Sequence, residues 1–295
     1  MTFILKPSFF KHRPYLFAVL LISGCANMQL AQNSAQDFSN AASSLVSAQR
    51  QVLNDANAAV LQSTKDRQEA AYVSGGAFSL DAVTQSIPAS TIDARVQAAQ
   101  AVQLYGQALS DLLNGSTETK VDSYTEALAG SVKKTFPHVN VGTSGEISAA
   151  VAGLADIALQ RYEYKSASAI AQAAQPNLAS IAKLFSDDTL LVDAQFQAAA
   201  MVDPIARTQT LNAIRADPHV PADRRDAVFN AMFARPPVTD LSNEQADVNQ
   251  LMSTMIKANT ALASGQQDTF SAFAKAAYLR GKDMASVYST VKNNK

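Results

Sequence analysis

The sequence predicts an all-α protein, an elongated antiparallel bundle of long amphipathic helices. Alanine, the best helix former, is by far the commonest residue, whereas glycine (11) and proline (10) are scarce and gather at a few apparent breaks. Apolar residues recur at steps of three and four through most of the chain, which is the period of one helix face. Strand-like alternation is almost missing, because the nearest case, Val139 to Val141, is too short to build a sheet.

The first two helices have the clearest pattern. One is expected over 34–73, about 60 Å long at 1.5 Å per residue. The second is expected over 90–113, with Ser90 or Thr91 as its N-cap and Gly115 just past its end. The apolar faces carry Phe38, Ala41, Leu45, Ala48, Val52, Ala56, Ala59 and Val60 in the first helix and Ile92, Val96, Ala99, Val102, Leu109 and Leu113 in the second.

Later helices follow the same period with more interruptions. They are expected at 120–134, 144–174, 177–202, 204–215, 222–234, 243–263 and 266–291. The segment from about 203 to 241 holds five prolines, which permit only short helices there. Small residues on the apolar seams of the last two helices allow close packing. Residues 34–295 are therefore predicted to form one helical bundle domain.

The first 24 residues have the three parts of a secretory signal peptide. Its start is positive and carries no acid, and 15–22 form an apolar run of about eight residues, where a permanent membrane helix needs roughly 20. The basic residues are Lys6, Lys11 and Arg13. The leader ends in Ile22-Ser23-Gly24-Cys25, which resembles the lipobox of bacterial lipoprotein precursors.

In that family the cysteine thiol receives a diacylglycerol, the leader is cut before the cysteine, and the new amino terminus is usually acylated too. The resemblance thus implies lipidation of Cys25, and two or more acyl chains hold a protein durably at a membrane. An Asp after the cysteine retains enterobacterial lipoproteins at the inner membrane. Ala26 stands there, so the resemblance implies an outer-membrane anchor facing the periplasm. Residues 25–33 are expected to be the lipidated start and a polar tether that reaches at most about 30 Å.

The net charge and the cysteine content limit the range of possible partners and stabilising interactions. The 24 basic residues less the three of the leader leave 21 against 25 acidic residues, a net charge of about −4 for the mature chain. Such a mild value argues against nucleic acid as a partner, because nucleic acid requires clustered Lys and Arg. A single cysteine cannot form an internal disulfide, so stability has to come from packing.

No pattern of a metal site or cofactor site is present. The mature chain has two histidines, His138 and His219, and each follows a proline. Neither has a glutamate three residues before it, as a di-iron site in a bundle requires, and H-E-x-x-H is absent. We therefore expect no metal and no cofactor, and turn positions for both histidines.

Motifs of nucleophilic catalysis are equally weak. The stretch 142–146 begins like G-x-S-x-G but ends in Glu and follows no strand, so it is expected to start a helix at Ser144 with Glu146 in the first turn. Asp187 and Asp188 show no apolar pocket that would shift a carboxyl pKa. A solvated helix junction is expected there, and no enzyme is predicted.

One cluster in the proline-rich segment is a candidate partner site. It combines the aromatic, Met and Arg residues that are enriched in protein interfaces. Its members are Arg224, Arg225, Val228, Phe229, Met232, Phe233 and Arg235. The favoured interpretation is that the four apolar residues face the bundle core. In the alternative, Phe229, Met232, Phe233 and Arg235 bind a partner, because irregular segments held on a rigid scaffold often carry binding sites.

We expect a membrane-anchored envelope lipoprotein that acts as a structural or accessory protein-interaction module. Its expected partners are the membrane, through lipid on Cys25, and another envelope protein. A protective binding lipoprotein, for example one that neutralises a toxin in the periplasm, has the same sequence requirements. An unrecognised enzyme and a membrane-active helical protein are further alternatives, although no apolar hairpin of about 20 residues follows Cys25.

Overall fold

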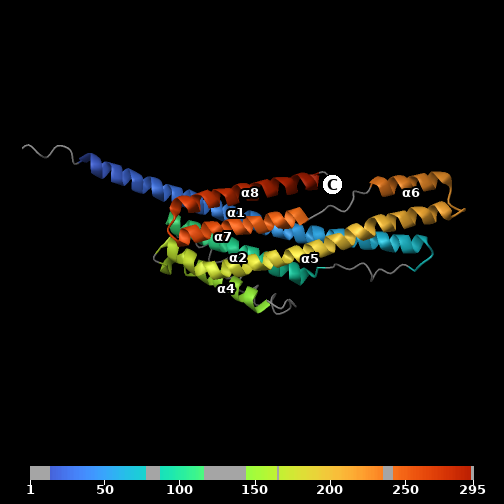
Figure 1. Cartoon of the computed structure of the whole chain (residues 1–295), viewed down its shortest axis with the longest axis horizontal. Helices are drawn as coiled ribbons and strands as arrows, with labels where there is room; N and C mark the ends of the chain where they lie inside the picture. The colour runs from blue at the N-terminus through green and yellow to red at the C-terminus, as the bar shows by residue number, and fades with distance from the viewer. Residues whose placement is uncertain (1–13, 78–86, 116–143, 165, 235–241, 294–295) are drawn as a thin grey trace, which may run out of the picture.

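The computed structural model is a long helical bundle (Figure 1). It describes residues 14–77, 87–115, 144–164, 166–234 and 242–293, with the side chains of 14–27, 144, 242 and 288–293 excepted. Every regular element in these ranges is helical, and none of them is a strand. The all-α class and the packing of helices against one another are confirmed. The helix expected at 120–134 lies outside the described residues.

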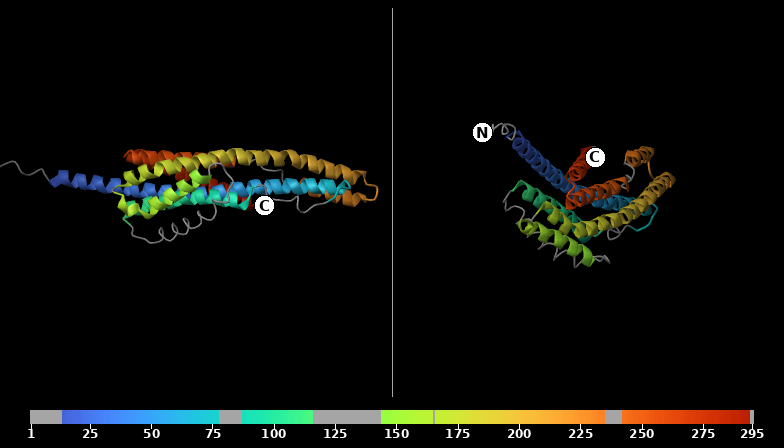
Figure 2. Two further views of the ribbon diagram at one scale, coloured as in Figure 1. Left: turned by 90° about the horizontal axis from the view of Figure 1, so that it is seen from below. Right: turned by 60° about the vertical axis from the view of Figure 1, so that its left-hand side comes forward.

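Seven α-helices and one short 3-10 helix make up the described chain. They are α1 (Pro14–Val73), α2 (Ala89–Asn114), α4 (Ser144–Leu159), η3 (Arg161–Glu163), α5 (Ala167–Ala216), α6 (Ala222–Ala234), α7 (Ser242–Ala263) and α8 (Gln267–Asn293). The helix α1 runs through the bundle and packs against α2, α5 and α8, while α7 lies between α5 and α8, and α4 covers α2 and α5. Figure 2 shows the resulting elongated shape from two further sides.

The two ends of the bundle differ. At the proximal end the Gln32 amide of α1 donates to the Leu113 carbonyl at the end of α2 (3.0 Å), and η3, the start of α5 and the α7–α8 turn lie at the same end (Figure 1). The Ser168 hydroxyl ties two of these elements together by donating to the Ala263 carbonyl (2.7 Å). At the other end α1, α5 and α6 continue beyond the remaining helices. We call residues 58–73, 190–216 and α6 the distal arm.

Small residues let the long helices approach closely. A Cβ placed on Gly106 of α2 would lie 3.1 Å from the Cα of Ser39, and one on Gly281 of α8 would lie 2.8 Å from the Cβ of Ser44. Beside the first contact the buried rings of Phe38 and Tyr105 meet edge to face, with centroids 5.8 Å apart. The core is therefore built on α1, with large side chains set between close backbone crossings.

Several expected boundaries are wrong. The helix α1 includes 26–33, which we expected to be an extended tether, because the Ala, Met, Leu and Gln residues there are strong helix formers. The expected helix 144–174 is interrupted by η3, and Ser166 then caps α5 by accepting from the Ala169 N–H (3.2 Å). Conversely, α5 continues through Pro204, where we expected a break. The proline removes only one backbone hydrogen bond, and the buried residues on both sides of it keep α5 packed against neighbouring helices.

The helix ends give a mixed result. Gly115 terminates α2 in the left-handed conformation (φ 65°), as predicted. The N-cap of α2, however, is Pro88, whose carbonyl accepts from the N–H groups of Thr91 and Ile92, so the expected Ser90 or Thr91 cap is wrong. The helices at 222–234, 243–263 and 266–291 are confirmed to within one or two residues.

Candidate partner-binding site

The distal arm is a thinner continuation of the bundle. Asn57 of α1 exchanges two hydrogen bonds with the backbone of Ile87 (2.7 and 2.8 Å), which fixes where α2 begins. Gln245 of α7 donates to the Phe185 carbonyl of α5 (3.0 Å) and fixes where α7 begins. Past these points the described neighbours of α5 are α1 and α6 (Figure 1). The arm therefore has fewer helices with which to bury apolar side chains.

The short helix α6 is held to α5 near its end and to the α5–α6 turn near its start. Near its end Arg207 of α5 donates to the Met232 carbonyl (3.1 Å), while its Nε is 2.8 Å from Asp203. Near its start the Arg225 guanidinium donates to the carbonyls of Val220 (3.0 Å) and Asp217 (3.2 Å). Because these contacts fix both ends, α6 is a docked element of the fold.

The two phenylalanines of α6 face solvent, so the prediction that they lie in the core is wrong. Phe229 is 49% exposed and Phe233 is 70% exposed, whereas Met232 is buried. The rings lie one helical turn apart with centroids 4.5 Å from each other. The reason is geometric: the four apolar residues of α6 span a wide arc, and α5 covers the part that carries Met232. We call Phe229 and Phe233 the aromatic pair.

The remaining members of the predicted cluster are spread around α6. Arg224 is exposed, Val228 is half-buried, and Arg225 serves the α5–α6 turn. Arg235 lies outside the described residues. The structure thus brings Phe229 and Phe233 together on the surface, and it leaves Met232 as the residue that attaches them to α5.

A second exposed apolar set lies on α5. Leu190, Met201 and Ile205 are exposed and stand 11 and 4 residues apart, which places them on one side of the helix. Exposed apolar side chains therefore occur on both α5 and α6 of the distal arm.

The distal arm also contains an open cavity of about 540 Å³ between α1 and α5. Arg67, Ser74, Gln209 and Asn212 are among the residues that line it.

A buried polar cluster joins three helices in the bundle. Asp188 of α5 is fully buried, its Oδ1 lies 2.5 Å from the Nε of Arg95 (α2), and its Oδ2 accepts from the Gln49 amide of α1 (2.9 Å). Burial raises the pKa of Asp188 to about 6, and the Arg95 charge and the Gln49 hydrogen bond oppose this. The expectation of a solvated junction at Asp187 and Asp188 is wrong for Asp188.

Sequence reasoning missed this cluster, although a signal existed. Asp188 stands between Phe185 and Val192 at steps of three and four, which is the buried face of α5. Asp187, by contrast, is exposed and pairs with Lys183 (2.8 Å). A carboxylate without solvent-exposed surface cannot meet a substrate, so the cluster serves packing and helix register.

A second buried polar contact lies nearer the proximal end. The Tyr105 hydroxyl of α2 donates to the Asn259 side chain of α7, whose amide donates to the Ala171 carbonyl of α5 (2.9 Å). Burial raises the pKa of Tyr105 far above its ordinary value, so it remains a neutral donor. These hydrogen bonds link three helices, and they satisfy polar groups that would be costly to bury without a partner.

The positions considered for metal binding and catalysis are described in part. No group of three or more His, Cys, Asp and Glu side chains that could hold a metal occurs among them. His219 is exposed in the α5–α6 turn, as expected, and His138 lies outside the described ranges. Ser144 starts α4 with Glu146 in its first turn, which confirms the helix-start interpretation.

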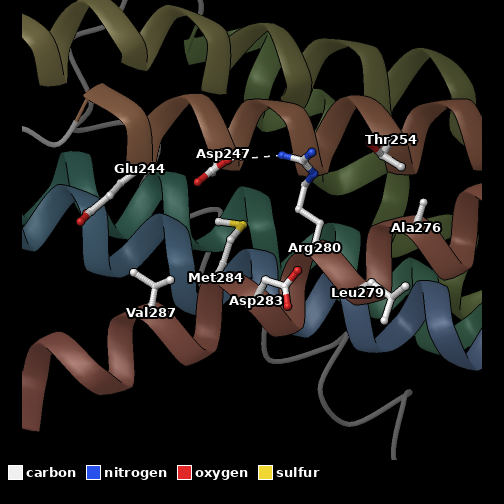
Figure 3. Close-up of a pocket in the computed structure, with 9 residues that line it drawn as sticks. All are labelled: Glu244, Asp247, Thr254, Ala276, Leu279, Arg280, Asp283, Met284 and Val287. Carbon is white, nitrogen blue, oxygen red and sulfur yellow. Dashed lines mark hydrogen bonds and ion pairs between the residues drawn. The ribbon is translucent and has the colours of Figure 1, made fainter.

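The cavity drawn in Figure 3 is a groove between α7 and α8 of about 480 Å³. The Arg280 side chain crosses it and is held by the Asp247 carboxylate (3.3 Å) and the side-chain amide oxygen of Gln250 (2.5 Å). Leu279, Met284 and Val287 supply apolar lining. Glu244, Asp247 and Asp283 line the groove together with this one arginine, so its polar lining is acidic on balance.

Cys25 falls within the backbone of α1, in the part of the helix that projects from the proximal end, and its side chain is outside what the structure describes. None of the helices in the described part of the chain combines the length and apolarity needed to cross a membrane. No protein-family model, curated protein or solved structure matches the chain. The lipobox-like sequence and the geometry of the bundle are therefore the basis for a functional proposal.

Proposed function

We propose that this chain is a lipid-anchored cell-envelope protein whose bundle holds the aromatic pair away from the membrane for binding to another envelope protein. The lipobox at Cys25 supports the anchor, with the outer membrane and a periplasm-facing domain as the proposed location. The observation that carries the proposal is the exposed pair Phe229 and Phe233, fixed to the end of the molecule opposite Cys25.

The length of the bundle supports a spacer role. From Cys25 to Val73 the helix α1 runs for 49 residues, or roughly 70 Å at 1.5 Å per residue. A rigid helix of this length sets a distance that a flexible chain would not. The lipid would hold one end and the aromatic pair would be presented at the other.

The chemistry of the pair suits a protein partner. Aromatic side chains dominate the energetics of protein interfaces because they offer large rigid apolar area. Full burial of one phenylalanine contributes about 1.5–3 kcal/mol. With 49% and 70% of the two side chains exposed, a partner that covers both would gain about 2–4 kcal/mol, or well over tenfold in affinity.

The test is co-purification from envelopes with the variant Phe229→Ser/Phe233→Ser. We expect it to fold and localise like the parent protein and to lose its partner. The matched control is Leu279→Ser/Val287→Ser, which changes two exposed apolar residues of α8 and should keep the partner. Equal recovery of the partner with both variants would contradict the proposal.

A further inference from the structure

The proximal end of the bundle carries its own exposed apolar side chains. Tyr162 of η3 is 52% exposed and Leu159 at the end of α4 is 37% exposed. Met28 of α1, also exposed, precedes Gln32 by one helical turn and so shares the face that reaches the end of α2. These three side chains come from different elements but belong to the same end of the molecule.

Tyr162 is held firmly in place. The Arg161 side chain, almost fully buried, lies under its ring with the guanidinium carbon 4.4 Å from the ring centroid. The same guanidinium donates to the Ala158 carbonyl (2.9 Å) and to the Tyr162 hydroxyl oxygen (3.2 Å), and its Nε is 3.9 Å from Asp111 of α2. The exposed ring therefore stands on a rigid support that ties η3 to α4 and α2.

The position of this end relative to Cys25 follows from the chain. Gln32 contacts the end of α2, and Cys25 precedes it by seven residues of α1, or about 10 Å of helix. Asp111, which lies beside Arg161, is two residues from the Leu113 carbonyl that accepts from Gln32. A lipid attached at Cys25 thus leaves only a short helical segment between the membrane and η3.

We propose that the proximal end rests on the lipid bilayer, with Tyr162, Leu159 and Met28 in the interfacial layer, so that the bundle stands upright. This inference depends on the lipidation of Cys25 proposed above. Tyrosine suits that layer because its ring is apolar and its hydroxyl remains hydrated, which is why it is enriched at membrane interfaces. Exposed Glu163 next to it disfavours anionic headgroups, so the bilayer surface expected here is zwitterionic.

The chain offers a clean test because it contains no tryptophan. Tyr162→Trp places a single tryptophan at the proximal end, and Tyr72→Trp places one at an exposed site on the distal arm (Tyr72 is 65% exposed). Each variant is expressed from the full chain with its leader, purified, and reconstituted into phosphatidylcholine vesicles with plain or brominated acyl chains. Vesicle flotation is measured on the same samples.

We expect the Tyr162→Trp emission to shift to the blue in vesicles and to lose intensity with brominated chains, while the Tyr72→Trp emission does neither. Leu159→Trp provides a second proximal reporter in case the first disturbs Arg161, and thermal melting checks the fold of each variant. Floating protein with unquenched proximal reporters would overturn the inference while leaving the anchor intact, and quenching at residue 72 would show a bundle lying flat. Failure to float would refute the lipid anchor itself.

Discussion

Replacing Arg95 with Met tests the buried polar cluster, because it leaves the Asp188 carboxylate in the core without its cation. The side chains of Arg95 and Asp188 are 7% and 0% exposed, and Nε and Oδ1 lie 2.5 Å apart. Removing one partner of a buried ion pair costs about 3–5 kcal/mol, since the remaining charge is uncompensated. We therefore expect the free energy of unfolding to fall by this amount at pH 7.5.

The loss should depend on pH. Burial has already raised the pKa of Asp188 to about 6, and loss of Arg95 raises it further because an attractive charge disappears. At pH 5 the carboxyl is mostly protonated in both proteins, so Arg95→Met removes little more than a hydrogen bond, worth about 1 kcal/mol. Urea unfolding followed by far-UV circular dichroism at pH 5 and 7.5 measures both values. A loss that is the same at both pH values, or below about 1 kcal/mol at pH 7.5, would refute the reasoning.

Three further predictions concern the buried carboxyl, the aromatic pair and the lipid anchor. A carboxyl with a raised folded-state pKa contributes stability at low pH, and this stability is lost as the pH rises through about 6. Asp188→Asn should therefore reduce the change in urea midpoint between pH 5 and 7.5. An unchanged pH dependence would contradict this assignment to Asp188. Phe38→Ala should lower the free energy of unfolding by about 3–5 kcal/mol, because the Phe38 ring is fully buried against Tyr105. Phe229→Ala/Phe233→Ala should lower the free energy of unfolding by about 1 kcal/mol or less. Equal losses for the two variants in thermal or urea melts would show that the aromatic pair belongs to the core. Cys25→Ala should abolish labelling by a fatty-acid analogue and leave an uncleaved precursor. Normal labelling of that variant would refute the proposed lipidation of Cys25.

The fold class could be predicted because helix period and composition are local properties of the chain. Phe38, Leu45 and Val52 repeat at a heptad spacing and are all buried. Helix ends were harder where the deciding contact is distant. The break before Ser166 contains no glycine or proline and follows the turn that Arg161 makes against Asp111 of α2. Pro204 looked like a break, yet the buried residues around it keep α5 continuous.

The candidate site shows the limit of periodicity more clearly. The pattern of α6 identifies Phe229, Met232 and Phe233 as apolar neighbours, but it carries no information on how many helices will cover them. Among the described helices a single one, α5, packs against α6, so Met232 is buried and the aromatic pair is exposed. Asp188 is the reverse case, a charge on an apolar face whose partners on α1 and α2 are 139 and 93 residues away in sequence.

The most direct test of the partner-binding proposal is photo-crosslinking in intact cells from a benzophenone side chain placed at Phe233, with residues 1–25 unchanged. The proposal predicts a discrete crosslinked adduct between this chain and one envelope protein. The same probe at Leu279, an exposed apolar position on α8, should give no such adduct. Absence of an adduct from position 233, or the same adduct from both positions, would contradict the proposal that the aromatic pair is the partner-binding site.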